Sequence, residues 1–190
     1  MSLLGRLLKD RRAGETHGAW SRPNLAAPEL LEPTSEDFED GGAMPRDHHA
    51  KNVGGRNLSP RLAWNAPPQG TAQLLLVMED PDVPLGKPAV HCVALVDPAV
   101  RALAAGALAA GRPADGVRVL RSTIGRGYHG PAPIKGHGPH RYVFQLFALA
   151  APVGATPDGT APERARPRVL LSSVTAPVLA RGRLTGTVER

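Results

Sequence analysis

The sequence predicts an all-β domain of short strands joined by turns, and two observations predict it. Of the 190 residues, 21 are Gly and 20 are Pro, so more than a fifth of the chain favours turns. Three apolar runs have the length of buried strands and are bounded by such turns: 73–79, 90–96 and 142–149. Many strands separated by turns favour two packed sheets, and the length suits one domain with its own core.

The remaining elements are expected to be short. An Ala-rich segment, 101–114, is predicted as either a weak helix or a loop, because it contains two Gly residues. The others are strands at 62–65, near Phe38 and at 184–188, and a helix within 169–180 that Pro177 interrupts.

Charge and composition restrict the class of protein. The net charge is +6 and the pI about 10.2, but the basic residues are scattered and aromatics make up only 4% of the chain. A stacking platform for nucleic acid is therefore missing, and we expect no nucleic-acid partner. The single cysteine, Cys92, permits no intrachain disulfide and fits a reducing compartment. No apolar run reaches the ~20 residues of a membrane span, so a cytoplasmic protein is expected.

Residues 1–28 are predicted to form an N-terminal arm, and residues 29–190 the domain. The arm begins with a basic, amphipathic helical pattern of four Leu residues, Leu3, Leu4, Leu7 and Leu8. Such a helix suits weak contact of residues 1–12 with a membrane surface or a partner. At about three turns it is marginal alone in water, so we favour a frayed segment that docks on its own domain or stays flexible.

Three polar residues lie at the ends of the predicted central strands. Asp80 follows the first strand, His91 enters the second and His140 enters the third. A carboxylate with two imidazoles gives a pocket whose proton count adjusts near neutral pH, and the amides of the Gly-rich loop 128–139 add donors. The sequence therefore predicts a small-anion pocket. Alternation places Arg141 opposite His140, as a structural ion-pair partner.

Three other interpretations stay open. A buried His at a strand end can simply hydrogen-bond a loop carbonyl. A hydrolase would use a His as general base oriented by Asp80, but Ser59 and Ser122 lack a nucleophile motif, and alternation turns Cys92 away from His91. A metal site has suitable ligand types without a known spacing; its ligands would be Asp80, His91, His137 and His140.

An ordered set of motifs resembles the phosphatidylethanolamine-binding protein family, in its bacterial Raf-kinase-inhibitor-like branch. One such motif would be weak evidence, but the order of the set makes the resemblance specific over about residues 33–190. The motifs are GGRNLSP at 54–60, DPDVP at 80–84, the strand with His91, YHGP at 128–131, GPHRYVF at 138–144 and VLARGRLTGT at 178–187.

The resemblance implies a large central antiparallel sheet packed on a smaller sheet, with few helices. It implies a pocket for phosphate-like or carboxylate anions and phospholipid head groups, no cofactor and no established enzymatic reaction. Family members bind or modulate kinases or proteases, and bacterial members suggest a homodimer. The residues that fall on pocket or rim positions are Asp80, His91, His140, Pro81, Asp82, Tyr128, Gly130 and Pro131.

Two departures from the family pattern change the expected mouth of the pocket. Aromatic residues usually precede the pocket His, whereas this chain has Ala89 and Val90. The rim at 131–135 reads PAPIK, so Lys135 adds positive charge. A wider, less aromatic mouth is expected, which weakens the case for lipid head groups more than the case for small anions.

Overall fold

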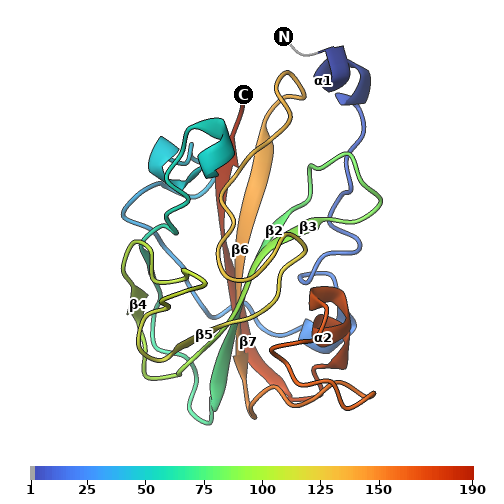
Figure 1. The fold of residues 1–190 in the computed structure, drawn as a ribbon. Coiled ribbons are helices and arrows are strands. Elements are labelled where there is room, and N and C mark those ends of the chain that lie inside the picture. Colours follow the sequence, from blue (N-terminus) through green and yellow to red (C-terminus); the bar gives the residue numbers. More distant parts are fainter. Residues whose placement is uncertain (1–2) are drawn as a thin grey trace.

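A computed structural model describes residues 3–190, and a five-stranded antiparallel sheet is its central element (Figure 1). The strand order is β5-β3-β2-β6-β7, formed by β2 (Gln73–Asp80), β3 (Ala89–Val96), β5 (Val117–Val119), β6 (His140–Leu149) and β7 (Val178–Val188). A second sheet pairs β1 (Leu62–Ala63) with β4 (Ala102–Leu103). The helices are α1 (Leu3–Leu8), α2 (Pro167–Ser173) and three 3-10 turns at Pro23–Leu25, Arg46–His48 and Lys51–Val53. Among the described residues, no helix is long and apolar enough to cross a membrane.

One face of the large sheet packs on the small sheet. Leu74 and Leu76 of β2 and Phe144 of β6 share a buried cluster with Leu62 and Leu103 of the small sheet. Trp64 also belongs to this cluster. The predicted all-β class, with a large sheet packed on a smaller one and few helices, is therefore confirmed.

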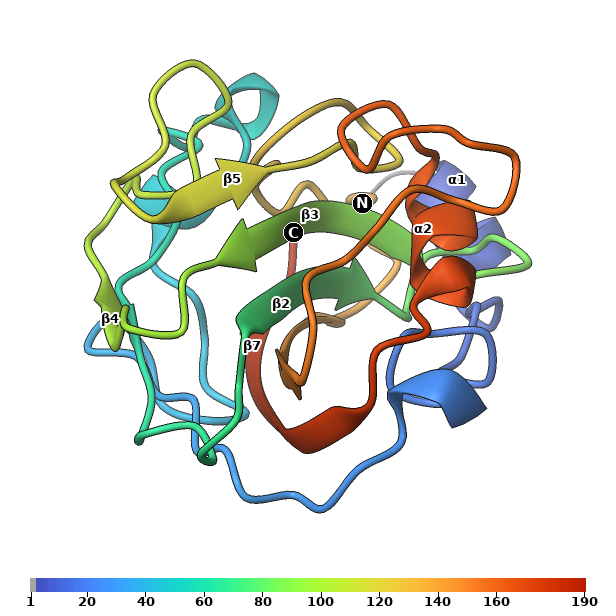
Figure 2. The ribbon, with the colours of Figure 1, turned by 90° about the horizontal axis from the view of Figure 1, so that it is seen from below.

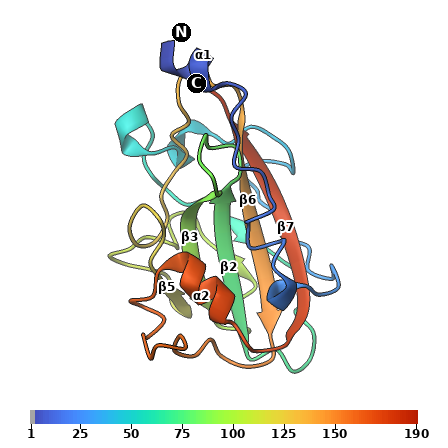
Figure 3. The ribbon, with the colours of Figure 1, turned by 90° about the vertical axis from the view of Figure 1, so that its right-hand side faces the viewer.

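The other face of the large sheet is also covered. Leu75 and Phe147 pack beneath Leu170 of α2, which lies across β2 and β3 (Figures 2 and 3). Ala19 and Leu25, from the predicted arm, are fully buried in the same cluster. Because both faces are buried, β2 and β3 read as continuous apolar runs rather than as alternating patterns.

Several predicted elements differ from the structure. The predicted helix at 169–180 ends at Ser173, and β7 begins at Val178, because Pro177 cannot continue a helix and Val178 suits a strand. Within 101–114 only β4 is regular, since Gly106 takes a φ of 83° that ends any helix. No strand forms near Phe38; Thr34 and Ala43 make only isolated bridges on either side of it. β5 was not predicted.

Candidate functional site

Asp80 and His140 meet at one end of the large sheet. β2 ends near the start of its antiparallel neighbour β6, where Glu79 pairs with Val143, so Asp80 and His140 come to the same end of the sheet. His140 and Tyr142 lie on the same side of β6 because side chains alternate along a strand. Arg141 turns to the opposite side and pairs with Asp82, with 2.9 Å between Nε and Oδ2. The prediction that Arg141 is an ion-pair partner is confirmed.

A β-bulge brings His91 to this face. Met78 pairs with Cys92 but Glu79 pairs with Val90, so His91 is the extra residue of β3. A bulge turns two successive side chains to the same side of a strand. Cys92 and Tyr142 belong to the buried cluster between the large and the small sheet, and the centroids of the His91 and Tyr142 rings lie 5.2 Å apart in an edge-on arrangement. The prediction that His91 and Cys92 face opposite ways is therefore wrong.

A chain of hydrogen bonds links three buried polar side chains. His140 Nδ1 lies 2.8 Å from Asp80 Oδ2, and His140 Nε2 lies 2.7 Å from Nδ1 of His137. All three residues are at most 2% exposed. A buried carboxylate is retained at low cost only when such partners satisfy it, so this chain fixes the rotamers of Asp80 and His140.

His91 is held separately, from the other side of the site. Its Nδ1 lies 2.8 Å from the carbonyl oxygen of His129 and therefore donates its hydrogen there. Burial lowers the pKa of His91, although that hydrogen bond and the charge of Asp80 oppose the shift. Burial and the nearby Asp80 carboxylate also raise the pKa of Tyr142, so its hydroxyl stays protonated.

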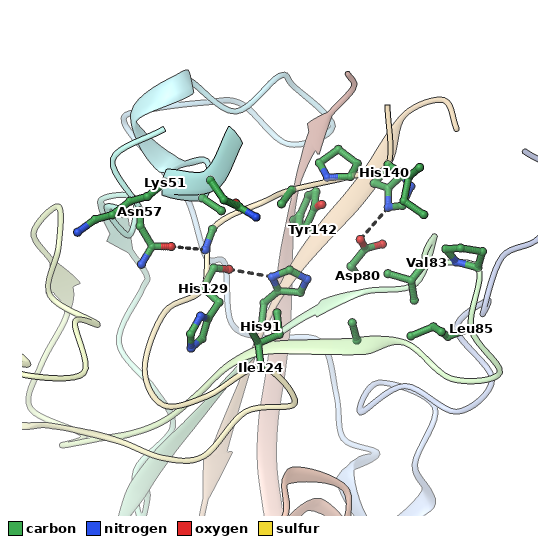
Figure 4. Close-up of a pocket in the computed structure, with 18 residues that line it drawn as sticks. Lys51, Asn57, Asp80, Val83, Leu85, His91, Ile124, His129, His140 and Tyr142 are labelled. Atoms are coloured by element: carbon green, nitrogen blue, oxygen red, sulfur yellow. Dashed lines mark hydrogen bonds and ion pairs between the residues drawn. The ribbon is translucent and has the colours of Figure 1, made fainter. Parts of the chain in front are cut away.

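These side chains form the floor of a cavity of about 570 Å³ (Figure 4). We call Asp80, His91, His140 and Tyr142 the polar floor. Apolar residues make the walls, among them Leu85 and Ile124, whose side chains are 59% and 54% exposed. The lining is completed by Ala50, Lys51, Asn52, Asn57, Val83, Pro84, Ala89, His129, Gly130, Ala132, Pro133 and Ile134.

The rim is braced by Asn57. Its side chain accepts a hydrogen bond from the Gly130 amide at 2.7 Å and donates one to the Tyr128 carbonyl at 3.1 Å. Asn57 has a φ of 58°, a left-handed conformation that Asn tolerates better than most residues. A Cβ on Gly130 would collide with the His48 carbonyl, so only Gly lets the two loops approach this closely.

The predicted site residues divide into two groups. Asp80, His91, His140 and Gly130 line the cavity. Four others do not. Asp82 lies outside the cavity. Burial acts to raise the pKa of its carboxyl group, but hydrogen bonds from Arg141 outweigh burial and lower that pKa. Pro81, Tyr128 and Pro131 act through the backbone or the core: the Pro81 and Pro131 carbonyls accept amide hydrogens, and the Tyr128 hydroxyl donates to the His48 carbonyl.

Tyr142, Asn57 and His129 are among the lining residues that the sequence did not assign to the pocket. Tyr142 was assigned only to a strand, although it lies two residues after His140 and alternation could have placed it beside that residue. Asn57 and His129 have no local signal, because a turn motif does not show what its side chains reach. Lys135, expected to add charge at the mouth, does not line this cavity; Lys51 supplies the cation there.

No expected nucleophile lines the cavity. Cys92 is buried, and burial raises the pKa of its thiol to about 12. Ser59 and Ser122 are buried elsewhere, and each hydroxyl oxygen accepts backbone amide hydrogens, from Leu108 and from Gly125 among others. The structure therefore gives the hydrolase interpretation no attacking group among these candidates.

The metal interpretation also meets a geometric obstacle. Within residues 3–190, no group of three or more His, Cys, Asp or Glu side chains has an arrangement that could hold a metal ion. His137 and His140 use their ring nitrogens on each other and on neighbouring oxygens. His137, proposed as a ligand, does not line the cavity.

A β-sandwich with a polar-floored cavity at one end of its large sheet defines a class of ligand-binding domain. A family model described as phosphatidylethanolamine-binding protein matches residues 34–189. Because the match covers most of the chain, the protein belongs to the phosphatidylethanolamine-binding protein family, as its motifs predict.

Individual relatives agree with this assignment. A UPF0098 protein of Aquifex aeolicus is 32% identical over 131 residues, which cover 68% of this chain and 74% of that protein. The putative lipoprotein LppC of Mycobacterium tuberculosis is 34% identical over 166 residues, covering 86% and 74%. YbcL of Escherichia coli, described as a new member of the mammalian PEBP family, matches in structure with a TM-score of 0.72 and 25% identity, over 84% of this chain and 98% of YbcL.

Proposed function

We propose that this chain is a non-enzymatic binding protein for a small anionic group, a phosphate, phosphoester or carboxylate. The observation that supports it most is His91, which lies between His129 and Asp80 at the base of the cavity (Figure 4). Its Nδ1 is committed to a carbonyl, while its Nε2 makes no hydrogen bond to any residue among 3–190. Protonation of Nε2 creates a fixed N–H donor with a positive charge, which suits an anion.

The walls suggest what carries the anion. Exposed Leu85 and Ile124 flank the mouth, and the lining above the floor is largely apolar. An anion attached to a larger apolar group would bury that group there. A phospholipid head group fits this description, and so does a side chain of a protein partner such as the kinase or protease that family resemblance implies.

Isothermal titration with inorganic sulfate tests the proposal, because the charge of sulfate is constant near neutral pH. Affinity should fall as the pH rises from about 6 to about 8, since anion binding requires a proton on His91. His91→Ala should lose binding, while His17→Ala, which removes an exposed imidazole outside the cavity, should keep it. Phosphate and phosphoethanolamine then identify the preferred group. Equal affinity of His91→Ala and the parent chain would overturn the proposal.

A further inference from the structure

A segment ahead of the family-matched residues packs on the outside of a loop that lines the cavity. We call residues 8–14 the strap. The Ala13 amide donates to the Val83 carbonyl and the Gly14 amide to the Pro81 carbonyl, both at 2.9 Å. The family model begins only at residue 34. The strap therefore adds an outer layer to loop 81–88, whose residues Val83 and Leu85 face the ligand space.

His137 connects the strap to the polar floor. Its Nε2 lies 2.8 Å from the Leu8 carbonyl oxygen and 3.1 Å from that of Arg11. Its Nδ1 lies 2.7 Å from His140 Nε2. His137 is only 2% exposed, so bulk water has little access to its ring nitrogens.

The number of hydrogens that these hydrogen bonds require fixes the total charge of His137, His140 and Asp80. Carbonyl oxygens only accept, so His137 Nε2 carries one hydrogen. One hydrogen lies between the two rings and one between His140 and Asp80, which makes three. Two neutral rings and an ionised carboxylate hold only two. The trio of His137, His140 and Asp80 therefore holds one extra proton and is neutral overall, wherever within it that proton resides.

Without the strap carbonyls, the third hydrogen has no fixed acceptor. His137 could then donate through Nδ1 to His140, His140 to Asp80, and two hydrogens would satisfy both bonds. The trio would carry a charge of −1 beside His91. An entering anion would meet that charge in a site of low dielectric, where repulsion between like charges is strong.

We propose that His137 is a positioning residue of the anion site, and that the strap, acting through it, holds the proton that neutralises Asp80. This inference rests on the proposed function, since it concerns the electrostatics of the same cavity. It assigns a role in ligand binding to residues outside the family-matched region.

Other charged groups surround the trio. His91 and Tyr142 face it from within the cavity, and His129 lines the same space. Outside, Arg12 lies 3.2 Å from Asp82 and 3.1 Å from the Pro139 carbonyl, and Asp82 also holds Arg141. Arg190 donates to the Pro133 carbonyl. These Arg and Asp groups are the same in the parent chain and in every variant. The charges of Asp80 and His140 act on the pKa of His91, but burial lowers that pKa, so at about pH 8 the parent chain and the variants should all take up the His91 proton when sulfate binds.

The test counts the protons taken up when sulfate binds. For each proton taken up on binding, the affinity for sulfate falls about tenfold per unit rise in pH, once the pH is above the pKa of the group that takes up the proton. The parent chain should take up about one proton, on His91. His137→Leu removes the acceptor of His140, so the trio becomes negative and the uptake should rise to about two. The affinity gap between the two proteins should therefore widen as the pH rises.

Two further full-chain variants separate positioning from folding. His137→Gln offers an acceptor to His140 and a donor to the strap, so it should restore an uptake of about one proton. Gly14→Pro removes a strap hydrogen bond and cannot adopt the φ of 69°, so it should shift the uptake toward two. Gly159→Pro is the matched control: it has a φ of 79° and an amide bonded to the Thr156 carbonyl, far from the strap in sequence and outside the cavity.

The outcomes distinguish this inference from the proposed function. If the parent chain binds no sulfate, the proposed function fails. If the parent chain binds but His137→Leu takes up the same number of protons, the inference fails and the anion site stands. An affinity loss that is equal at every pH would reduce His137 to a structural role and would also overturn the inference. Thermal unfolding confirms that each variant is folded at the temperature of titration.

Discussion

Glu79 and Asp80 are adjacent buried carboxylates at the end of β2, and they have different roles. Asp80 belongs to the polar floor, at the base of a cavity of about 570 Å³. Glu79 faces the other side of the sheet, where it binds the Ala19 amide and the Gln145 side chain, both at 2.8 Å. Arg168 completes this group, with Nη1 2.6 Å from Glu79 Oε1. We call Glu79, Gln145 and Arg168 the Glu79 brace.

The difference lies in the partners and the space, not in burial. Asp80 and Glu79 are 1% and 3% exposed. The brace pairs its carboxylate with a guanidinium that stays charged, and the hollow beside it offers only about 20 Å³, room for about one water. The floor pairs its carboxylate with imidazoles, which gain and lose protons near neutral pH. The same strand end thus provides one site built for stability and one suited to binding.

The largest effect should follow from breaking the brace. Glu79→Ala leaves the Arg168 charge and the Ala19 amide without their partner, and should lower the free energy of unfolding by about 3–5 kcal/mol in urea titration. Glu163→Ala, which removes the surface pair with Arg118, should cost no more than about 1 kcal/mol. Similar losses in both variants would contradict the contrast between brace and surface.

The rim should be next in sensitivity. Asn57→Ala removes two hydrogen bonds to the loop over the cavity and should cost about 1–3 kcal/mol. Sulfate binding should weaken as well, because Gly130 and its neighbours line the site. Asn65→Ala is the control, since Asn65 also makes two hydrogen bonds to backbone, at an exposed position. If both variants bind sulfate equally, the rim does not shape the cavity.

A pH profile of stability should separate the floor from the brace. Burial holds the pKa of His91 below its ordinary value of about 6.5, so the unfolded chain takes up this proton first as the pH falls. The contribution of His91 to stability is therefore complete above about pH 6.5 and declines below it. The parent chain should lose stability between about pH 7 and pH 5 more steeply than His91→Gln, and sulfate should reduce the loss. Parallel profiles would contradict the burial of a neutral His91.

The polar floor could be predicted from the sequence more completely than the Glu79 brace. Asp80 and His140 could be predicted because each adjoins an apolar run of strand length. In neighbouring antiparallel strands, the end of one lies near the start of the other. His91 was predicted as a site residue with the wrong geometry, since a bulge depends on the neighbouring strand. Nothing near Glu79 in the sequence indicates Ala19 or Arg168, which are 60 and 89 residues away. The contact of Leu8 with His137 is equally remote, so local patterns could not show it.

The smallest effect should come from the mouth, where charge is exposed. Lys51 lines the cavity near Asn57, on an exposed 3-10 turn (Figure 4). Lys51→Gln should weaken sulfate binding by about two- to threefold at low salt, because an exposed cation attracts anions weakly. The difference should vanish at high ionic strength, where exposed charges are screened, while the larger effect of His91→Ala persists. Lys87→Gln, on an exposed residue that does not line the cavity, should change nothing. A loss at Lys51 that resists salt would place this cation in direct contact with the bound anion, and the site would then extend from the floor to the mouth.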